Sequence, residues 1–181
     1  MKLPELDITL IEALSDLDKW LVQNQRSLYL EIIGASALRL HHIEIGRPTI
    51  DIDLSNEIED SEVLHKIKEI GLTYGLDETW LEHPLNLELP RGAILTDHKL
   101  FSALKNITVK IVDIETLLVL KIAALYDRRE HQLTDLEDIE AILAAGHKLS
   151  EDIIDRAKTE IKKSKKFSFE KMNQFLKELQ G

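Results

Sequence analysis

The sequence predicts a mixed α/β (α+β) protein in which a small mixed β-sheet with flanking helices precedes a C-terminal helical bundle. Short apolar or alternating runs at residues 28–33, 49–54 and 107–112 are typical of strands, and helical patterns surround them. Beyond the third run only helical patterns follow. We therefore expect two parts, residues 1–115 and 116–181, in a chain long enough for a compact domain and a smaller helical one.

The N-terminal part is expected to begin with a helix, a strand and a second helix. Leucines recur every three or four positions from Leu6 to Leu21, which gives one apolar stripe on a helix. Residues 28–33 are almost wholly apolar, as in a buried strand, and Gly34 ends this run. Residues 35–42 lack helix breakers and predict the second helix.

The next segment is expected to form a second strand and a third helix. Residues 49–54, Thr-Ile-Asp-Ile-Asp-Leu, alternate with the period of a strand, so the two aspartates are expected on one face. A helix is expected over residues 59–71, with Gly71 as its C-terminal cap. Repeated glycines and prolines follow, and there we expect only a short strand at 85–89.

The C-terminal part is predicted to be helical after the strand at 107–112. The expected helices span residues 116–129, 135–145, 151 to about 163, and 168 or 169 to 179. Thr134 and Ser150 are the expected N-terminal caps of the second and third of these, and Gly146 is expected to end the second.

Composition narrows the class of protein. The chain has no cysteine, so it forms neither disulfides nor thiolate zinc sites, and its formal net charge of −10 argues against a surface that binds nucleic acid everywhere. It has no continuous apolar run near the ~20 residues that span a bilayer, and no signal peptide is evident. We expect a soluble cytoplasmic protein without a membrane partner.

One basic cluster interrupts the acidic chain. The segment KTEIKKSKKF places five lysines between residues 158 and 166. We interpret it first as a solvated helix face that aids solubility. Contact with a polynucleotide or an acidic partner is the alternative.

Asp51 and Asp53 are the candidate metal ligands. Side chains two residues apart on a strand project to the same side, with Cα atoms about 7 Å apart. Carboxylate oxygens suit Mg²⁺ or Mn²⁺, and Mg²⁺ usually completes its shell with water and substrate phosphates. The alternative is that both acids simply lie on the solvent-exposed face of an edge strand.

The turn before this strand is a candidate phosphate site. Gly34 lets the backbone approach a ligand closely, and the amides of Ala35 and Ser36 at the start of a helix can face phosphate oxygens. The Ser36 hydroxyl would add a donor. Its alternative role is a plain N-terminal cap.

The order of these elements resembles the DNA polymerase beta-like nucleotidyltransferase superfamily. It consists of a strand, the Gly34-Ala35-Ser36 turn, a helix, and the strand that carries Asp51-Ile-Asp53. The segment LLVLKIAALYDRREHQLTDLEDIEAIL, residues 117–143, looks like the K-x-x-A, R, D-x-x-D-I pattern of the AbiEii-like nucleotidyltransferases. That group includes toxins of toxin-antitoxin and abortive-infection systems.

The resemblance implies a metal-dependent transfer of a nucleoside monophosphate from a nucleoside triphosphate (NTP) to an acceptor hydroxyl. Asp51, Asp53 and Lys121 would be catalytic, with Mg²⁺ or Mn²⁺ on the two aspartates. RNA, tRNA or a protein is the expected acceptor, and a cognate antitoxin is an expected partner. Two alternatives stay open: a non-catalytic nucleotide-binding or protein-binding relative, and an antibiotic nucleotidyltransferase.

Lys121, Arg128 and Arg47 are the candidate phosphate-binding cations. Lys121 interrupts an apolar run and needs an anionic partner, which a triphosphate would supply. Arg128 lies two helical turns further along nearly the same face. The alternative is an ion pair of Lys121 or Arg128 with Asp135 or Asp138. Arg47 beside the aspartates is expected to meet phosphate or RNA, or else to be an ordinary surface residue.

A third carboxylate is common in the superfamily, and two candidates are present. Glu88 lies in the possible strand at 85–89, and Asp113 closes the strand at 107–112. The superfamily also has a Gly-Ser pair where this chain has Ala35 between the two residues. Nucleotidyl transfer depends on whether one of these acids completes the site and on whether Ser36 keeps the phosphate-binding position.

Overall fold

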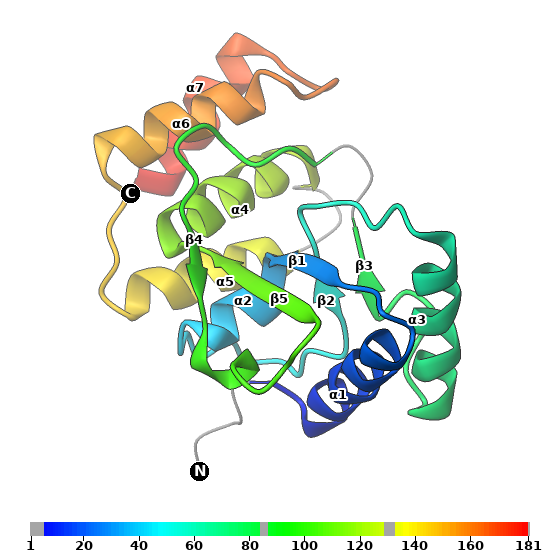
Figure 1. The fold of residues 1–181 in the computed structure, drawn as a ribbon. Coiled ribbons are helices and arrows are strands. Elements are labelled where there is room, and N and C mark those ends of the chain that lie inside the picture. Colours follow the sequence, from blue (N-terminus) through cyan, green and yellow to red (C-terminus); the bar gives the residue numbers. More distant parts are fainter. Residues whose placement is uncertain (1–5, 84–86, 129–132, 181) are drawn as a thin grey trace.

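The computed structural model describes residues 6–83, 87–128 and 133–180, and within them the predicted α+β fold class is confirmed (Figure 1). Its elements in chain order are α1 (Ile8–Gln23), β1 (Leu28–Ile32), α2 (Gly34–Leu40), β2 (Ile52–Asp53), α3 (Ser61–Thr73), β3 (Leu81–Glu82), β4 (Leu95–Asp97), the 3₁₀ turn η1 (Lys99–Phe101), β5 (Ile107–Val112), α4 (Ile114–Arg128), α5 (Thr134–Ala144), α6 (Glu151–Ile161) and α7 (Phe169–Gln180).

The strands form two small sheets that meet at the end of β1. The larger sheet has the order β1-β5-β4, with β1 parallel and β4 antiparallel to β5. The smaller sheet pairs β2 with β3 in parallel. A single antiparallel bridge between Ile32 and Leu54 joins the two sheets. The sheet content is therefore mixed, as predicted.

Helix α1 confirms the leucine stripe. Leu10, Leu14, Leu17 and Leu21 are all buried, and each such burial contributes about 1.5–3 kcal/mol. Asp18 lies on the buried side as well, where its carboxylate accepts hydrogen bonds from three successive backbone N–H groups that lead into β5. This contact fixes α1 against the start of β5.

Gly71 is not the C-terminal cap of the third helix, because α3 continues to Thr73. The indole of Trp80 instead packs on Gly71: a Cβ there would lie 2.5 Å from Trp80 Cδ1. Trp80 Nε1 also donates to the Ile67 carbonyl at 2.8 Å. The glycine thus makes room for the tryptophan that precedes β3.

Several other predicted boundaries need correction. Thr134 is the first residue of α5 and not its cap, whereas Ser150 caps α6 as predicted, its hydroxyl accepting from the Ile153 N–H. The strand expected at 85–89 lies partly outside the described residues, and residues 87–89 have no regular structure. Two short strands, β3 and β4, flank this segment instead.

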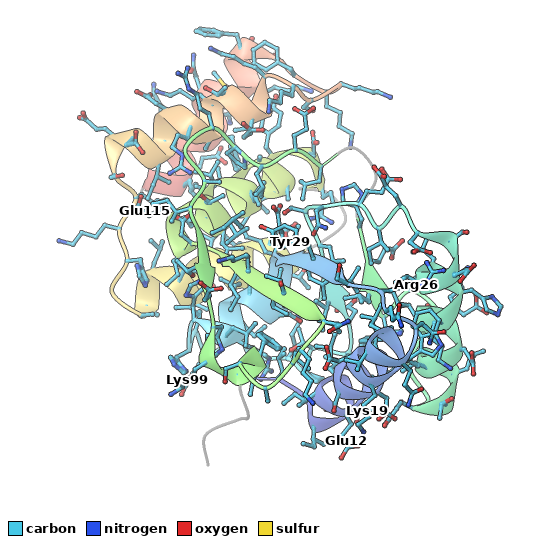
Figure 2. The ribbon with its side chains drawn as sticks, viewed as in Figure 1. Glu12, Lys19, Arg26, Tyr29, Lys99 and Glu115 are labelled. Carbon is cyan, nitrogen blue, oxygen red and sulfur yellow. The ribbon has the colours of Figure 1, made fainter. Side chains whose placement is uncertain are left out.

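Helix α4 lies at the centre of the helical part. It contacts α5 and α6, and it also contacts α2 from the sheet-bearing part. In Figure 1, α1 and α3 lie at one end of the molecule and α6 and α7 at the other. Near the first end, Arg26 pairs with Asp60 and Glu62 of the α3 entry (Figure 2). The division at residues 115 and 116 stays a prediction.

No helix among the described residues has both the length and the apolar character that crossing a bilayer requires.

Candidate functional site

The side chain of Asp53 lies directly against Gly34. Backbone pairing brings them together: the Ile33 N–H donates to the Asp53 carbonyl at 2.9 Å, beside the Ile32–Leu54 bridge. Gly34 has φ +67°, and a Cβ on it would lie 2.9 Å from Asp53 Cγ. Both the backbone conformation and the close approach therefore require glycine at this position.

Asp51 precedes β2 in an exposed bend, so the strand is shorter than the predicted 49–54. Its backbone is nevertheless held at the turn, since the buried Ser36 hydroxyl donates to the Asp51 carbonyl at 2.6 Å. Ser36 is therefore not the N-terminal cap of α2, and its role as a phosphate donor stays a prediction. The N-terminal cap of α2 is Ile33, which offers no side-chain acceptor, and Ala35 lies half-buried in the first turn.

The environment of Asp53 is rich in negative charge. Burial is the main factor that raises the pKa of this carboxyl, and the nearby charge of Asp51 raises it further. Lys121 and Arg128 act in the opposite direction but do not cancel the effect. Both predicted aspartates, and two of the three predicted cations, Lys121 and Arg128, thus lie close enough to interact electrostatically.

Glu82 is an acid of this site that the sequence did not point to. It pairs with Asp53 in the parallel register of β2 and β3, so the two side chains leave the same face. Its charge also contributes to the raised pKa of Asp53. A two-residue strand among glycines and prolines carries no periodic signal, and this is why Glu82 was missed.

The predicted cations are engaged with two buried aspartates of α5. Lys121 Nζ lies 3.1 Å from Asp135 Oδ1 and 2.8 Å from Asp138 Oδ2. Arg128 Nη2 lies 2.9 Å from Asp135 Oδ2. The ion pairs left open as the alternative are therefore present. We call Arg47, Lys121, Arg128, Asp135 and Asp138 the α4–α5 ion-pair cluster.

Arg47 belongs to the same cluster and is not an ordinary surface residue. Its Nη1 and Nη2 donate to the two oxygens of Asp138 at 2.5 and 2.8 Å. Burial alone would raise the pKa of Asp138, but the hydrogen bonds from Arg47 and the charge of Lys121 outweigh it, and the pKa is lowered. The hydrogen bond to Asp138 in turn raises the pKa of Arg47.

Neither predicted third carboxylate joins the aspartates. Asp113 is bound elsewhere: its oxygens accept from the Ile94 N–H at 2.8 Å and from the Thr116 hydroxyl at 2.7 Å. Although burial opposes the effect, these hydrogen bonds lower the pKa of Asp113, which holds the start of α4. Glu88 is exposed and lines a groove beside α4.

The donor set fits a divalent cation supported by a phosphate ligand. Five carboxylates face three cations in this region, so negative charge is in excess: Asp51, Asp53, Glu82, Asp135 and Asp138 against Arg47, Lys121 and Arg128. No group of three or more His, Asp or Glu side chains is placed to hold a metal within the described part of the chain. The protein would supply Asp51 and Asp53, and water and phosphate the remaining ligands.

Comparisons of the chain with protein-family models, with curated proteins and with solved structures found no match. The resemblance to nucleotidyltransferases therefore stays a prediction from the motifs.

Proposed function

We propose that this protein is a metal-dependent nucleotidyltransferase. The observation that carries the proposal is the contact of Asp53 with Gly34, with Asp51 beside it and Lys121 and Arg128 facing it. A carboxylate pair next to a glycine turn, opposed by cations, is the arrangement that binding of a metal–triphosphate complex requires. The excess of negative charge is consistent with a cation as part of the ligand.

In the proposed reaction, the acceptor oxygen forms a bond to the α-phosphorus of an NTP, the bond to the leaving oxygen breaks, and pyrophosphate departs. Mg²⁺ or Mn²⁺ on Asp51 and Asp53 would supply charge neutralisation and polarise the phosphoryl group. Arg128 is half exposed and would bind phosphate oxygens. Lys121, less exposed, would help to fix the position of the triphosphate. Gly34 leaves the space that Asp53 occupies.

The test is label transfer from each α-labelled NTP, with Mg²⁺, to total RNA or to lysate protein. We expect labelled product with the wild type and a loss of at least about 100-fold with Asp51→Asn, since a positioned charge contributes on that order. Asp51 is exposed, so the variant should keep its fold. Asp97→Asn, an exposed aspartate on β4, is the control and should transfer normally. Equal transfer by Asp51→Asn would refute the proposal.

An RNA, tRNA or protein acceptor and a cognate antitoxin follow from the AbiEii-like resemblance. Growth arrest on expression, relieved by Asp51→Asn, would support the toxin assignment. Growth unaffected by the active enzyme would argue against it.

A nucleotide-binding protein without transfer is the second candidate. It is favoured by the pairing of Lys121 with Asp135 and Asp138, which leaves this cation already neutralised. Its signature would be saturable NTP binding, measured by calorimetry, with no labelled product under any acceptor condition.

A further inference from the structure

The connection between α6 and α7 combines exposed lysines with exposed aromatic rings. We call residues 162–169, which run from the end of α6 to the first residue of α7, the α6–α7 loop. Of the five lysines that the sequence predicts on a helix face, only Lys158 lies within α6, because this helix ends at Ile161. The four lysines of the loop are all exposed, and they are Lys162, Lys163, Lys165 and Lys166. The loop contains no acid, in a chain with a formal net charge of −10. Positive charge is therefore concentrated here.

The two aromatic rings need an explanation that solubility does not give. Phe169 is 65% exposed and Phe167 is 38% exposed. Exposed phenylalanines next to lysines lower solubility, so the cluster is poorly suited to the role of a solvated face. Rings interleaved with cations are the combination that holds unpaired bases and phosphates together.

The loop backbone is fixed to the last turns of α4. The Ser164 hydroxyl donates to the Asp127 carboxylate, and Lys166 Nζ donates to the Asp127 carbonyl at 2.7 Å. The Ser168 N–H donates to the Tyr126 hydroxyl at 3.0 Å. Since α4 also carries Arg128, the loop has a defined position relative to the candidate site.

Lys162 and Lys165 extend from this fixed backbone, and neither has an ion pair among the described residues. Lys163 differs, because its Nζ lies 2.8 Å from Glu160. Two lysines are thus available to phosphate groups at little cost.

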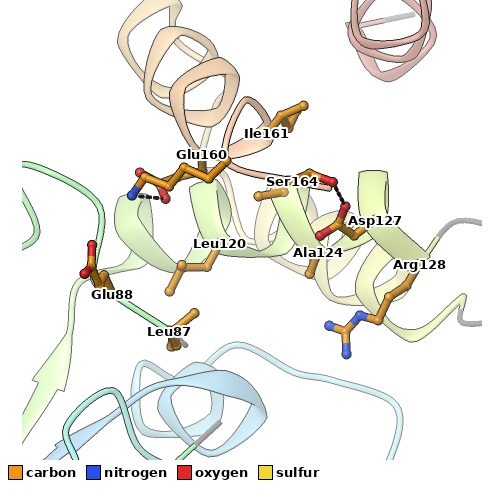
Figure 3. Close-up of a pocket in the computed structure, with 11 residues that line it drawn as sticks. Leu87, Glu88, Leu120, Ala124, Asp127, Arg128, Glu160, Ile161 and Ser164 are labelled. Carbon is orange, nitrogen blue, oxygen red and sulfur yellow. Dashed lines mark hydrogen bonds and ion pairs between the residues drawn. The ribbon is translucent and has the colours of Figure 1, made fainter. Parts of the chain in front are cut away.

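A groove of about 560 Å³ lies between the loop and Arg128 of α4 (Figure 3). Lys163 and Ser164 of the loop line it, and so does Arg128. Leu120 and Ala124 of α4 form an apolar wall between them, as Figure 3 shows. Three acids line the groove: Glu160 and Asp127 have partners, whereas Glu88 is exposed. Arg128 is near enough to Asp53 for its charge to lower the pKa of that carboxyl, so the groove is lined by a residue that also acts on the proposed reaction centre.

We propose that the α6–α7 loop and this groove bind single-stranded nucleic acid, with phosphates on Lys162 and Lys165 and a base stacked on Phe169. A duplex would offer the phosphates but not a free base face. An acidic protein segment would offer charge but no base. The role of the bound strand as nucleotidyl acceptor rests on the proposed function, whereas the binding itself does not.

The test is fluorescence anisotropy of a labelled single-stranded RNA of about 12 nucleotides, within the usual site size, titrated with the intact chain over a salt series. We expect Lys162→Gln/Lys165→Gln to reduce the slope of log K against log salt by about 1.4, from ~0.7 per phosphate contact. Phe169→Ala should weaken binding about tenfold and leave the slope unchanged.

The matched control is Lys99→Gln/Lys105→Gln, which removes two exposed lysines from the 3₁₀ turn and the connection after it. Lys99 lies away from the α6–α7 end of the molecule (Figure 2). Its variant should bind RNA like the wild type. The inference is overturned if the wild type does not bind, if the control weakens binding as much as the loop variants, or if Phe169→Ala has no effect while polyglutamate competes fully, which would indicate an acidic protein partner.

The two proposals fail in different ways. Asp51→Asn should still bind the RNA, because Asp51 lies outside the loop. RNA binding without label transfer would remove the proposed function and keep this inference. Label transfer with RNA binding that is insensitive to the loop variants would do the reverse.

Discussion

Asp53 is half-buried and Asp138 is fully buried, yet their pKa values shift in opposite directions. The pKa of Asp53 is raised by burial and by Asp51, whereas that of Asp138 is lowered by Arg47 and Lys121 in spite of burial. Burial acts on both carboxyls in the same sense. The sign of the net shift therefore depends on the charged neighbours.

The contrast separates a region in which the protein neutralises its own carboxylate from a region in which it does so only in part. Asp138 accepts two hydrogen bonds from Arg47 and is satisfied by the protein itself. Asp53 has acids as close neighbours and gains most from a cation that the protein does not supply. Negative charge that is not fully neutralised destabilises the fold. Sites where such charge persists are frequently functional.

The largest expected effect on stability concerns Asp138, the aspartate that the protein neutralises itself. Asp138→Ala leaves Arg47 and Lys121 without their shared partner, and breaking a buried ion pair in this way costs about 3–5 kcal/mol. Urea denaturation at pH 7 measures this loss. Asp97→Ala, which breaks an exposed pair with Lys110, is the control and should cost less than about 1 kcal/mol.

Acid should reduce the difference between wild type and Asp138→Ala. Because the folded-state pKa of Asp138 is lowered, its stabilisation is complete above the unfolded-state pKa of about 3.9 and is lost as pH falls through the lower folded value. Denaturation curves of both proteins should therefore converge below about pH 4. A constant difference down to pH 2 would show that lost packing, and not charge, causes the destabilisation.

Two glycine variants test the region around Asp53. Gly34 and Gly75 have nearly the same backbone, with φ +67° and +69°, but only Gly34 has a neighbour where a Cβ would lie. Gly75→Ala should cost about 1–2 kcal/mol from backbone strain alone. Gly34→Ala should cost a further 1–3 kcal/mol, because Asp53 must move. Equal losses in thermal or urea denaturation would show that the Asp53 contact is unimportant.

Asp53→Asn should raise the free energy of unfolding at neutral pH. A carboxyl whose folded-state pKa is raised binds more protons folded than unfolded, so its ionisation destabilises the fold as pH rises from about 3.9 through the folded value. The gain should thus be present at pH 7 and disappear below about pH 4. This gain in the free energy of unfolding should be smaller than the losses expected for Asp138→Ala and Gly34→Ala. A loss of stability at pH 7 would contradict the repulsive environment inferred for Asp53.

Arg128→Gln should have the smallest effect on stability, below about 1 kcal/mol, because the Arg128 side chain is half exposed and Asp135 keeps its pair with Lys121. Under the proposed function it should weaken NTP binding about tenfold, the contribution of one charge-assisted hydrogen bond. Calorimetry with and without Mg²⁺ measures the NTP affinity separately from the stability. Unchanged affinity would place Arg128 in the structural cluster alone.

The sequence predicted the part of the site that depends on local pattern. Alternation identified Asp51 and Asp53, and the glycine at the end of an apolar run identified the turn at Gly34. These are signals of two to six residues, and the structure brings Gly34 and Asp53 into contact. The length of the second strand was overestimated, because pairing with a neighbour, not alternation, decides where a strand ends.

Contacts over long sequence distances were not predictable in the same way. Arg47 and Asp138 are 91 residues apart, and nothing in either segment selects this pair over others. Ser36 offered two local roles, cap and phosphate donor, and in the structure its hydroxyl donates to the Asp51 carbonyl. Glu82 was missed because β3 is too short for a pattern. The fold class depended on many residues and was therefore the most secure prediction.

The position of Trp80 gives this protein an internal optical reporter. Its indole is fully buried on Gly71, and its own carbonyl accepts from the Ile52 N–H at 2.7 Å, one residue from Asp53. Only one other tryptophan exists, Trp20, and Trp20→Phe would leave a single emitter. The emission wavelength of Trp80 would then follow movements of the aspartate-bearing strand in real time, without a label attached anywhere on the chain.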